Sequence, residues 1–345
     1  MTKRLCFAAG DVGGARAILP VARLAAAEGY TVLGLDHGVF RAEGADGWHW
    51  VTHEDSLIAD FDALIYATSV ADPLAFQTAL SARTRGIPII HVLDNWSLYA
   101  ERLHGPDRFD VSQLLIPDVY CVMDQLARRE AIAAGVPEAI LQISGHPNLA
   151  GLAEEEASFA AAPSMNGHIL FVSEPAVIDS GDRQDPNGRG YDEVQVSALF
   201  AEAYAAMPKA QKLPIHIAPH PREDRIAVTT RWKELAQTHG LRFLIVPTDG
   251  VREALHTAKA VVGMSSLLLY EAWLLGQPTL SLQPDLRMDQ LAQPGKRDGL
   301  ELCTQVHDVM VAVQRLAAAA APKGTGRHDM ALHTGAARAV LFCAM

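Results

Sequence analysis

The sequence lacks the features by which a membrane, secreted or metal-binding protein is usually recognised. It contains no run of 18 apolar residues, so we expect no membrane-spanning helix. The opening residues, MTKRLCFAAGDVGG, carry a short basic stretch but too few apolar residues for a secretion signal. The 4 cysteines are scattered without the spacing of a metal site. These absences predict a reduced, cytoplasmic protein, with attachment to the inner face of the membrane left open.

Basic residues are also scarce. The chain has 29 Lys and Arg against 40 Asp and Glu, which gives a formal net charge of −11. Binding to a phosphate backbone needs a basic face, so this balance argues against a nucleic acid as partner. A small phosphorylated ligand is compatible with it, because a helix N-terminus and a few local cations can hold one.

What the sequence does contain is a regular alternation of short apolar runs and helical patterns. Its 345 residues exceed one comfortable core, and the alternation is typical of βα units around a parallel sheet. The strands expected in the first half are RLCFAAG, TVLGLD, ALIYAT, PIIHVLD, VYCVMD and LQISG, with helices at 14–28, 72–85 and 124–134. Those expected in the second half are HILFVSE, PIHIAPH, RFLIVP, AVVGMS and PTLSLQ, with helices at 191–207, 223–239, 251–258, 265–275 and 304–320.

The alternation predicts an α/β fold of two Rossmann-like parallel-sheet domains facing across a cleft. The first domain is expected at 1–150 and the second at 167–329, joined by an acidic, alanine-rich linker at 151–166. An apolar helix at 330–345 is expected to pack back on the first domain. Open α/β sheets bind ligands beyond the carboxyl ends of their strands, so polar residues that directly follow a strand are the site candidates.

The strongest candidate stretch is AVVGMSSLLLYEAWLLGQP, which begins at residue 260. A strand ends at Gly263, Ser265 and Ser266 precede a helix, and Glu271 lies one to two turns into it. Free N–H groups at such a helix start hold phosphate, and a carboxylate further along can accept from a ribose diol. The structural alternative is an ordinary N-cap followed by a surface glutamate.

This segment resembles the nucleotide-binding segment of GT-B glycosyltransferases, in which a Ser/Gly turn precedes a helix with Glu, then Gly and Pro. Glu271, Gly276 and Pro278 match that spacing. The resemblance implies that Glu271 binds the ribose and that the serine turn binds the diphosphate. The stretches GDVGGARAILPVARLAAAEGYTV and PDVYCVMDQLARREAIAAGVPEAILQISGHPNL also resemble the first loop and the end of the first domain in these enzymes.

His220 and Pro221 follow a strand, whereas His216 lies within it. The His-Pro pair resembles a motif of bacterial sialyltransferases and related capsule transferases, which implies that His220 contacts the nucleotide phosphate. Ser265–Ser266 fits their second motif, but their acidic pair followed by glycine has no clean match, so the donor is left open with CMP or UDP favoured. The alternative for His220 is a loop histidine bonded to backbone.

The opening turn, GDVGGA, supplies Gly10, Gly13 and Gly14, which allow a tight passage from strand to helix. It is not the dinucleotide pattern Gly-x-Gly-x-x-Gly, although Asp36 ends the second strand where a ribose-binding acid would lie in a dehydrogenase. Asp11 would repel a pyrophosphate but could accept a proton from a sugar hydroxyl. We therefore expect Asp11 to be a general base, with helix capping as the alternative.

Two further polar stretches follow predicted strands. Asp94, Asn95 and Trp96 are the types of residue that bind a sugar. Asp94 is the alternative candidate for the general base. The alternative role for Trp96 is packing in the core. After the strand HILFVSE, a long polar loop at 175–190 reads either as a lid or as a surface segment. Three residues of that stretch are expected to bind the donor, namely Glu174, Arg183 and Arg189. The motif Asp60-Phe61-Asp62 precedes a strand and is not expected to bind metal.

Together these patterns predict a metal-independent, cofactor-free glycosyltransferase of polysaccharide biosynthesis. A nucleotide sugar and a carbohydrate, lipid-linked or small-molecule acceptor are the expected partners. The expected catalytic residues are Asp11, Asp94 and His220, and the expected acceptor-binding residues are Gly13, Gly14, Asn95 and Trp96. One alternative is an epimerase or hydrolase of the UDP-N-acetylglucosamine 2-epimerase type, whose Gly-Thr-Arg-Pro-Glu opening is absent. A second alternative is a non-catalytic binding or scaffold protein.

Overall fold

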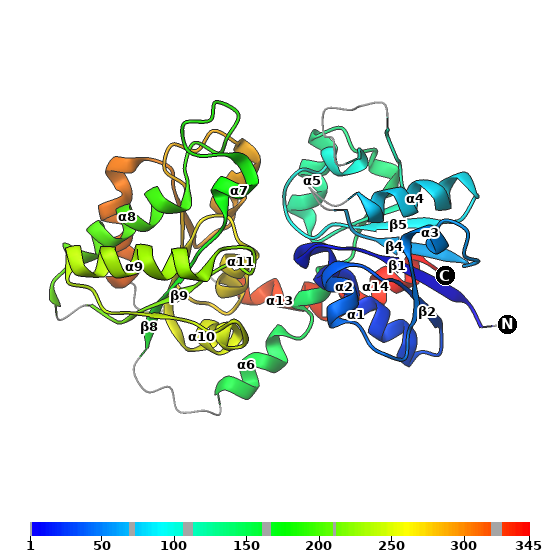
Figure 1. The fold of residues 1–345 in the computed structure, drawn as a ribbon, viewed down its shortest axis with the longest axis horizontal. Helices are drawn as coiled ribbons and strands as arrows, with labels where there is room; N and C mark the ends of the chain where they lie inside the picture. The colour runs from blue at the N-terminus through cyan, green and yellow to red at the C-terminus, as the bar shows by residue number, and fades with distance from the viewer. Residues whose placement is uncertain (1, 69–72, 106–112, 161–166, 210–211, 319–325) are drawn as a thin grey trace. The chain divides into compact units, whose positions relative to one another are not determined.

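The computed structural model describes the chain except for residues 1, 69–72, 106–112, 161–166, 210–211 and 319–325. The chain divides into two compact units (Figure 1). The first comprises Met1–Gly151 together with Met330–Met345, and the second comprises Leu152–Asp329. Among the described residues, no helix combines the length and the apolar character needed to cross a membrane.

The first unit is built on a seven-stranded sheet in the order β3-β2-β1-β4-β5-β6-β7, and every pair of neighbours is parallel. Its strands are β1 (Arg4–Ala8), β2 (Thr31–Leu35), β3 (His49–Val51), β4 (Ala63–Tyr66), β5 (Ile89–Val92), β6 (Val119–Val122) and β7 (Leu141–Ile143). Its helices are α1 (Val12–Ala27), α2 (Gly38–Glu43), α3 (His53–Ser56), α4 (Leu74–Thr84), α5 (Gln125–Ala133), α13 (Met330–Thr334) and α14 (Ala336–Cys343).

The second unit is built on a six-stranded sheet in the order β10-β9-β8-β11-β12-β13, again parallel throughout. Its strands are β8 (His168–Val172), β9 (Ile215–Ala218), β10 (Phe243–Ile245), β11 (Ala258–Gly263), β12 (Thr279–Leu282) and β13 (Leu300–Cys303). Its helices are α6 (Leu152–Ala160), α7 (Ala176–Ser180), α8 (Glu193–Ala205), α9 (Arg225–His239), α10 (Val251–Thr257), α11 (Leu267–Leu274) and α12 (Val309–Ala318).

Short 3₁₀ helices occur in both units. They are η1 (Glu101–Leu103), η2 (Glu138–Ile140), η3 (Pro147–Leu149), η5 (Thr248–Gly250), η6 (Asp289–Lys296), η7 (Val306–Asp308) and η8 (Gly326–His328).

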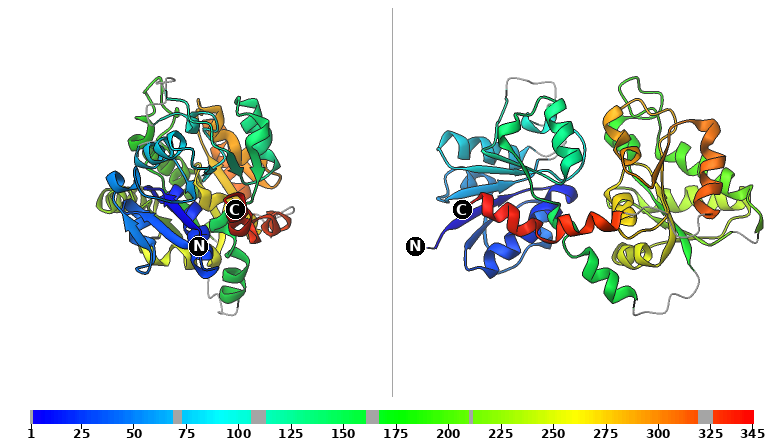
Figure 2. Two further views of the ribbon diagram at one scale, coloured as in Figure 1. Left: turned by 90° about the vertical axis from the view of Figure 1, so that its right-hand side faces the viewer. Right: turned by 180° about the vertical axis from the view of Figure 1, so that it is seen from behind.

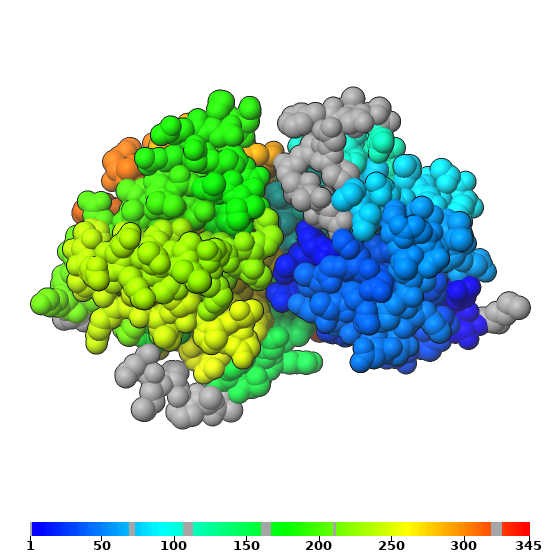
Figure 3. Space-filling view, viewed as in Figure 1, coloured from blue at the N-terminus to red at the C-terminus, as the bar shows by residue number. Residues whose placement is uncertain are grey.

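Both sheets are buried on their two faces, which explains why their strands read as continuous apolar runs. In β1, Leu5 and Phe7 point into a core shared with α1 and α14, whereas Cys6 and Ala8 point into a second core under α4. The second unit has a core of large rings, in which Phe171 packs edge-on against Trp232 with their centroids 5.0 Å apart. Trp232 belongs to α9, whose outer face is visible in Figure 3.

The expected α/β fold with two parallel-sheet domains is confirmed, and each expected strand and helix has a counterpart. Two strands were missed, β3 and β13, and both lie at the edge of a sheet. They are 3 and 4 residues long and partly exposed, so their apolar pattern is weak. Helix α6 occupies the first part of the segment expected to be a linker, and 161–166 lies outside the described residues.

The C-terminal segment belongs to the first unit. Val340, Leu341 and Ala344 enter the same core as α1, and the views from front and back agree in placing α14 beside that helix (Figures 1 and 2). The backbone N–H of His146 donates to Nδ1 of His333 at 3.0 Å. The first domain is thus completed by residues from the far end of the chain.

Two histidines stack in the second unit. The rings of His168 in β8 and His216 in β9 are 3.8 Å apart between centroids, and His168 Nε2 lies 2.9 Å from the carbonyl oxygen of Ala254. Burial lowers the pKa of His168 from 6.5 to about 4, and the neighbouring His216 adds to the effect. The neutral form is therefore the one that fits the fold.

We predict that this pair makes the protein sensitive to acid. Between pH 6.5 and about 4 the unfolded chain binds a proton at His168 that the folded chain does not, so stability falls as the pH falls through this window. His168→Gln should lose about 2 kcal/mol less stability than the wild type between pH 7.5 and pH 5.0. Urea denaturation at the two pH values measures this difference. His307→Gln, at an exposed histidine, is the control, and equal acid losses in wild type and His168→Gln would contradict the prediction.

Candidate functional site

In the first unit, the carboxyl end of β5 carries a buried ion pair. Oδ1 of Asp94 lies 2.7 Å from Nη2 of Arg102, and each side chain is about one-tenth exposed. Arg102 also donates to the backbone carbonyls of Thr68 at 2.9 Å and Ser97 at 3.2 Å. Burial alone would lower the pKa of Arg102, but Asp94 and other nearby acidic groups raise it, so the guanidinium stays charged. The pair therefore fixes a carboxylate at this edge of the sheet.

The same carboxylate packs against the start of α1. A Cβ on Gly13 would lie 2.4 Å from Oδ2 of Asp94, and a Cβ on Gly14 would lie 2.8 Å from Oδ1 of Asp11. The close approach of a carboxylate favours glycine at both positions, most strongly at Gly13, where Arg102 holds Asp94 in place. The side chain of Asp11 accepts from the N–H of Gly14 at 2.9 Å, so Asp11 caps α1. This cap is the alternative role considered for Asp11 from the sequence, and a role as base is untested.

A buried polar network continues from Asp94. The backbone carbonyl of Asp94 lies 3.1 Å from Nε2 of His146, whose Nδ1 accepts from the N–H of Asn148. Burial lowers the pKa of His146, so the ring is neutral and donates from Nε2. Trp96 is 4% exposed, and its Nε1 donates to Asp124 at 2.9 Å, so its ring serves packing. Asn95 accepts from the N–H of Trp96.

His146 was not among the residues expected in the site. A signal for it was present, because it lies just beyond the strand LQISG and meets the same rule that selected Asp94. Arg102 carries no such signal, because nothing local in the sequence shows that it pairs with Asp94.

In the second unit, the start of α11 holds a carboxylate of the chain itself. Oε1 of Glu174 accepts from the backbone N–H groups of Ser265 at 2.6 Å and Ser266 at 2.7 Å. Oε2 of Glu174 accepts from the hydroxyl of Ser265 at 2.7 Å. Gly263 is needed just before this turn, since a Cβ there would lie 2.9 Å from the carbonyl oxygen of Val172. The expected phosphate-binding groups thus converge on an anion.

Ion pairs extend this cluster along the loop that follows β8. Arg189 lies 3.4 Å from Glu174 and 2.9 Å from Asp179, and Arg222 lies 2.7 Å from Asp179. Burial would lower the pKa of Arg189, but Glu174 and the other nearby acidic groups raise it. Arg183 is exposed, and its backbone N–H lies 3.5 Å from Asp192. Only one of the two expected loop arginines therefore reaches the cluster.

His220 lies beyond β9 and beside the same loop cluster. Its backbone N–H donates to Glu223 at 2.8 Å, and its Nδ1 accepts from the N–H of Arg222 at 3.1 Å. Glu223 also accepts from the hydroxyl of Ser173 at 2.7 Å, and its burial raises its pKa. Pro221 is exposed next to it. His220 thus contacts the backbone of Arg222, and the side chain of Arg222 belongs to the chain of ion pairs that runs through Asp179 and Arg189 to Glu174.

Glu271 is held elsewhere. Its side chain is buried and forms an ion pair with Arg252, which also pairs with Glu155 of α6. A ribose diol would have to compete with Arg252 for this carboxylate. Arg252 carries no signal in the sequence, since only the fold brings α10 against α6 and α11.

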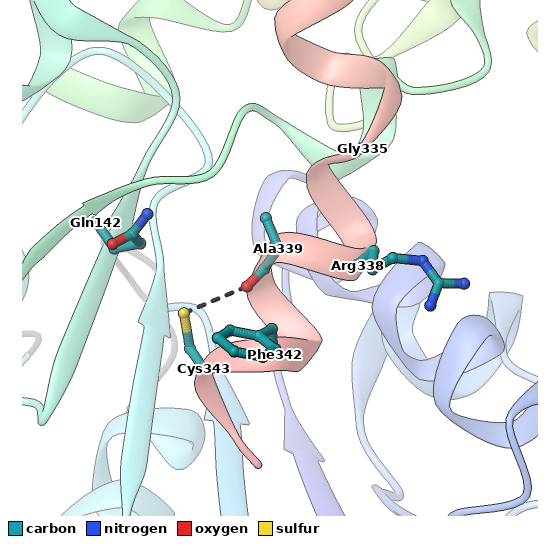
Figure 4. A pocket seen from close by; sticks show the side chains of 6 residues that line it. All are labelled: Gln142, Gly335, Arg338, Ala339, Phe342 and Cys343. Carbon is teal, nitrogen blue, oxygen red and sulfur yellow. Dashed lines mark hydrogen bonds between the residues drawn. The ribbon is translucent and has the colours of Figure 1, made fainter.

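A metal-binding cluster or a pocket elsewhere in the described part of the chain could also mark a functional site. Among the described residues, no group of three or more His, Cys, Asp or Glu side chains is placed to hold a metal ion. An open hollow of about 500 Å³ lies beside α14 (Figure 4). It contains none of the expected site residues, and it is lined by Gln142, Gly335, Arg338, Ala339, Phe342 and Cys343.

Comparison with known proteins places the fold. No family model and no curated protein matches the sequence. Among solved structures, the chain is similar to UDP-GlcNAc 2-epimerase from Rickettsia bellii, with a TM-score of 0.66, 14% identity and coverage of 99% of this chain and 96% of that one. For the Methanocaldococcus jannaschii UDP-GlcNAc 2-epimerase solved with UDP-GlcNAc and UDP, the TM-score is 0.62 and the identity 16%, with coverage of 97% of this chain and 98% of that one. For the Neisseria meningitidis UDP-GlcNAc 2-epimerase bound to UDP-GlcNAc, the TM-score is 0.62 and the identity 12%, with coverage of 99% of each chain.

These similarities establish a GT-B-like architecture of two Rossmann-like domains along essentially the whole chain. They contradict the expectation of a glycosyltransferase, because four of the similar structures are described as UDP-GlcNAc 2-epimerases. The signals interpreted as transferase motifs, a serine turn before a helix and a His-Pro pair after a strand, thus lie on a fold that is also similar to these epimerase structures. The acceptor-binding role expected for Gly13, Gly14, Asn95 and Trp96 depended on that expectation and stays an untested prediction.

The contact between Asp94 and α1 makes a testable prediction. Alanine in place of a helical glycine usually stabilises by about 1 kcal/mol. At Gly13 the added methyl would meet a carboxylate that Arg102 holds in place, so Gly13→Ala should destabilise the protein by about 1–3 kcal/mol. Urea denaturation measures this, with Gly47→Ala as control because a Cβ there meets nothing within 4 Å. Unchanged stability in Gly13→Ala would show that the carboxylate yields freely.

Proposed function

We propose that this protein is an enzyme that acts on a UDP-linked sugar, as an epimerase or hydrolase of the UDP-GlcNAc 2-epimerase type. The observation that carries the proposal is the correspondence of nearly the whole chain, in both domains, with solved UDP-GlcNAc 2-epimerases. Two of these neighbours are described in complex with UDP-GlcNAc.

The start of α11 is the proposed binding site for the diphosphate. It offers two backbone N–H groups and the hydroxyl of Ser265 to a single anion. Such a helix start binds phosphate through oriented donors and the helix dipole. Arg189 lies 3.4 Å from the carboxylate now held there, and Nδ1 of His220 accepts from the backbone N–H of Arg222, whose side chain pairs with Asp179.

The carboxylate of Asp94 is the proposed general base. Inverting a carbon that bears one hydrogen requires that the hydrogen leave one face and that another arrive on the opposite face, so the reaction needs a base and an acid. Asp94 is a fixed carboxylate at a strand end, with Arg102 on one oxygen and the start of α1 beside the other. His146 holds the backbone of Asp94 in place through its carbonyl. Asp11 is the second candidate base, although its side chain already caps α1.

We predict that the purified protein converts UDP-GlcNAc to its 2-epimer or hydrolyses it to UDP and free sugar. Proton NMR of the anomeric signals distinguishes the two products. Asp94→Asn should lower the rate by about 10²–10⁴-fold, as loss of a positioned base does. Glu138→Gln removes the same charge from an exposed ion pair with Arg128 and is the matched control.

Two results would contradict this prediction in different ways. Asn at position 94 leaves Arg102 without its counter-charge, so the melting temperature of the variant must be measured beside its rate. A folded Asp94→Asn enzyme with wild-type turnover would exclude Asp94 as the base. Absence of any product from UDP-GlcNAc, with UDP binding intact, would instead support a binding protein.

A further inference from the structure

In the second unit, the carboxylate of Glu174 occupies the anion-binding groups at the start of α11. Glu174 makes three short hydrogen bonds at the start of α11, to two backbone N–H groups and one hydroxyl, at 2.6–2.7 Å. Glu174 is only 7% exposed. A carboxylate that accepts from oriented main-chain donors and faces an arginine reproduces the contacts that a phosphate group would make there.

We propose that Glu174 is a built-in competitor of the nucleotide, which must leave the start of α11 before the diphosphate of a UDP-sugar can bind. This inference rests on the proposed function, since it concerns regulation of the same site. The two N–H groups and the hydroxyl that hold Glu174 are those proposed for the phosphate, so the two anions exclude each other.

Arg189 is placed to pass from one anion to the other. It lies 3.4 Å from Glu174 and 2.9 Å from Asp179. When Glu174 leaves, Arg189 keeps Asp179 as an anchor and regains a free side for the incoming phosphate. The exchange therefore replaces one carboxylate by one phosphate without leaving the guanidinium unpaired, which would be unfavourable for a buried charge.

The segment that would move is 174–190, which contains the short helix α7 and the loop after it. Glu174 lies at its start and Arg189 at its end, and Gly181 and Gly190 have φ values of 78° and 91° within it. Positive φ values of this kind are readily adopted only by glycine. Displacement of Glu174 would thus be coupled to the conformation of a loop that is tied to α11 by this carboxylate.

The competition has a measurable size. If the site is open in only a fraction of the molecules, the observed dissociation constant is the intrinsic one divided by that fraction. Removing the competitor should therefore tighten binding without adding any contact to the ligand. A purely structural role for Glu174 would give the reverse, a less stable protein that binds no better.

The experiment measures the affinity of wild type, Glu174→Ala and Glu174→Gln for UDP and for inorganic pyrophosphate by titration calorimetry. We expect Glu174→Ala to bind both at least 10-fold more tightly than wild type, and Glu174→Gln to change in the same direction. Asp182→Asn removes one charge from the same loop without touching α11 and should bind as wild type does. The unfolding temperature of each variant without ligand shows whether it is folded, and Glu174→Gln serves if the alanine variant is not.

Each outcome separates this proposal from the proposed function. Equal UDP and pyrophosphate affinities in wild type and both variants would overturn the competitor role and leave the proposed function standing. Tighter pyrophosphate binding by Glu174→Ala, with no binding of UDP to any variant, would support the competitor role and overturn the proposed function. Weaker binding of both ligands to the Glu174 variants would show that Glu174 organises the site instead.

Discussion

Burial of both faces of each parallel sheet is the constraint on which the arrangement of polar chemistry depends. Every residue of β4, β5 and β8 is buried, so the strands themselves have little room for charged groups. Charged groups collect where the strands end and the next helices begin. Asp94 and Glu174, the buried candidate carboxylates of the two domains, both lie at such ends.

The two candidate edges share an arrangement. In the first domain Asp94 packs on the start of α1 and pairs with Arg102. In the second domain Glu174 bonds to the start of α11 and pairs with Arg189. In each case a carboxylate, an arginine and a helix start are brought together, which satisfies a buried charge from two directions. The two proposed roles differ in whether the carboxylate has to move. Asp94 could act as a base where it stands, whereas Glu174 would have to leave the start of α11 before a phosphate could bind.

Much of the fold was predictable because its signals are local. The strand ALIYAT begins with five apolar residues in a row, and Asp124, Asp192 and Ser266 are recognisable caps. The edge strands β3 and β13 were missed because exposure weakens their pattern. Asp94, His220, Ser265 and Ser266 were selected as candidates by their position after a strand, whereas His146 meets the same rule and was not selected.

By itself the sequence determined the alternation of strands and helices, and so the set of residues placed at strand ends. Only the tertiary structure decided which of them meet. Glu174 and Ser265 are 91 positions apart, and His146 and His333 are 187 apart. Periodicity and capping depend on neighbours along the chain, but an ion pair or a hydrogen bond between strand ends depends on how the sheet orders its strands. That is why the serine turn could be read as an anion site, while the anion that occupies it could not.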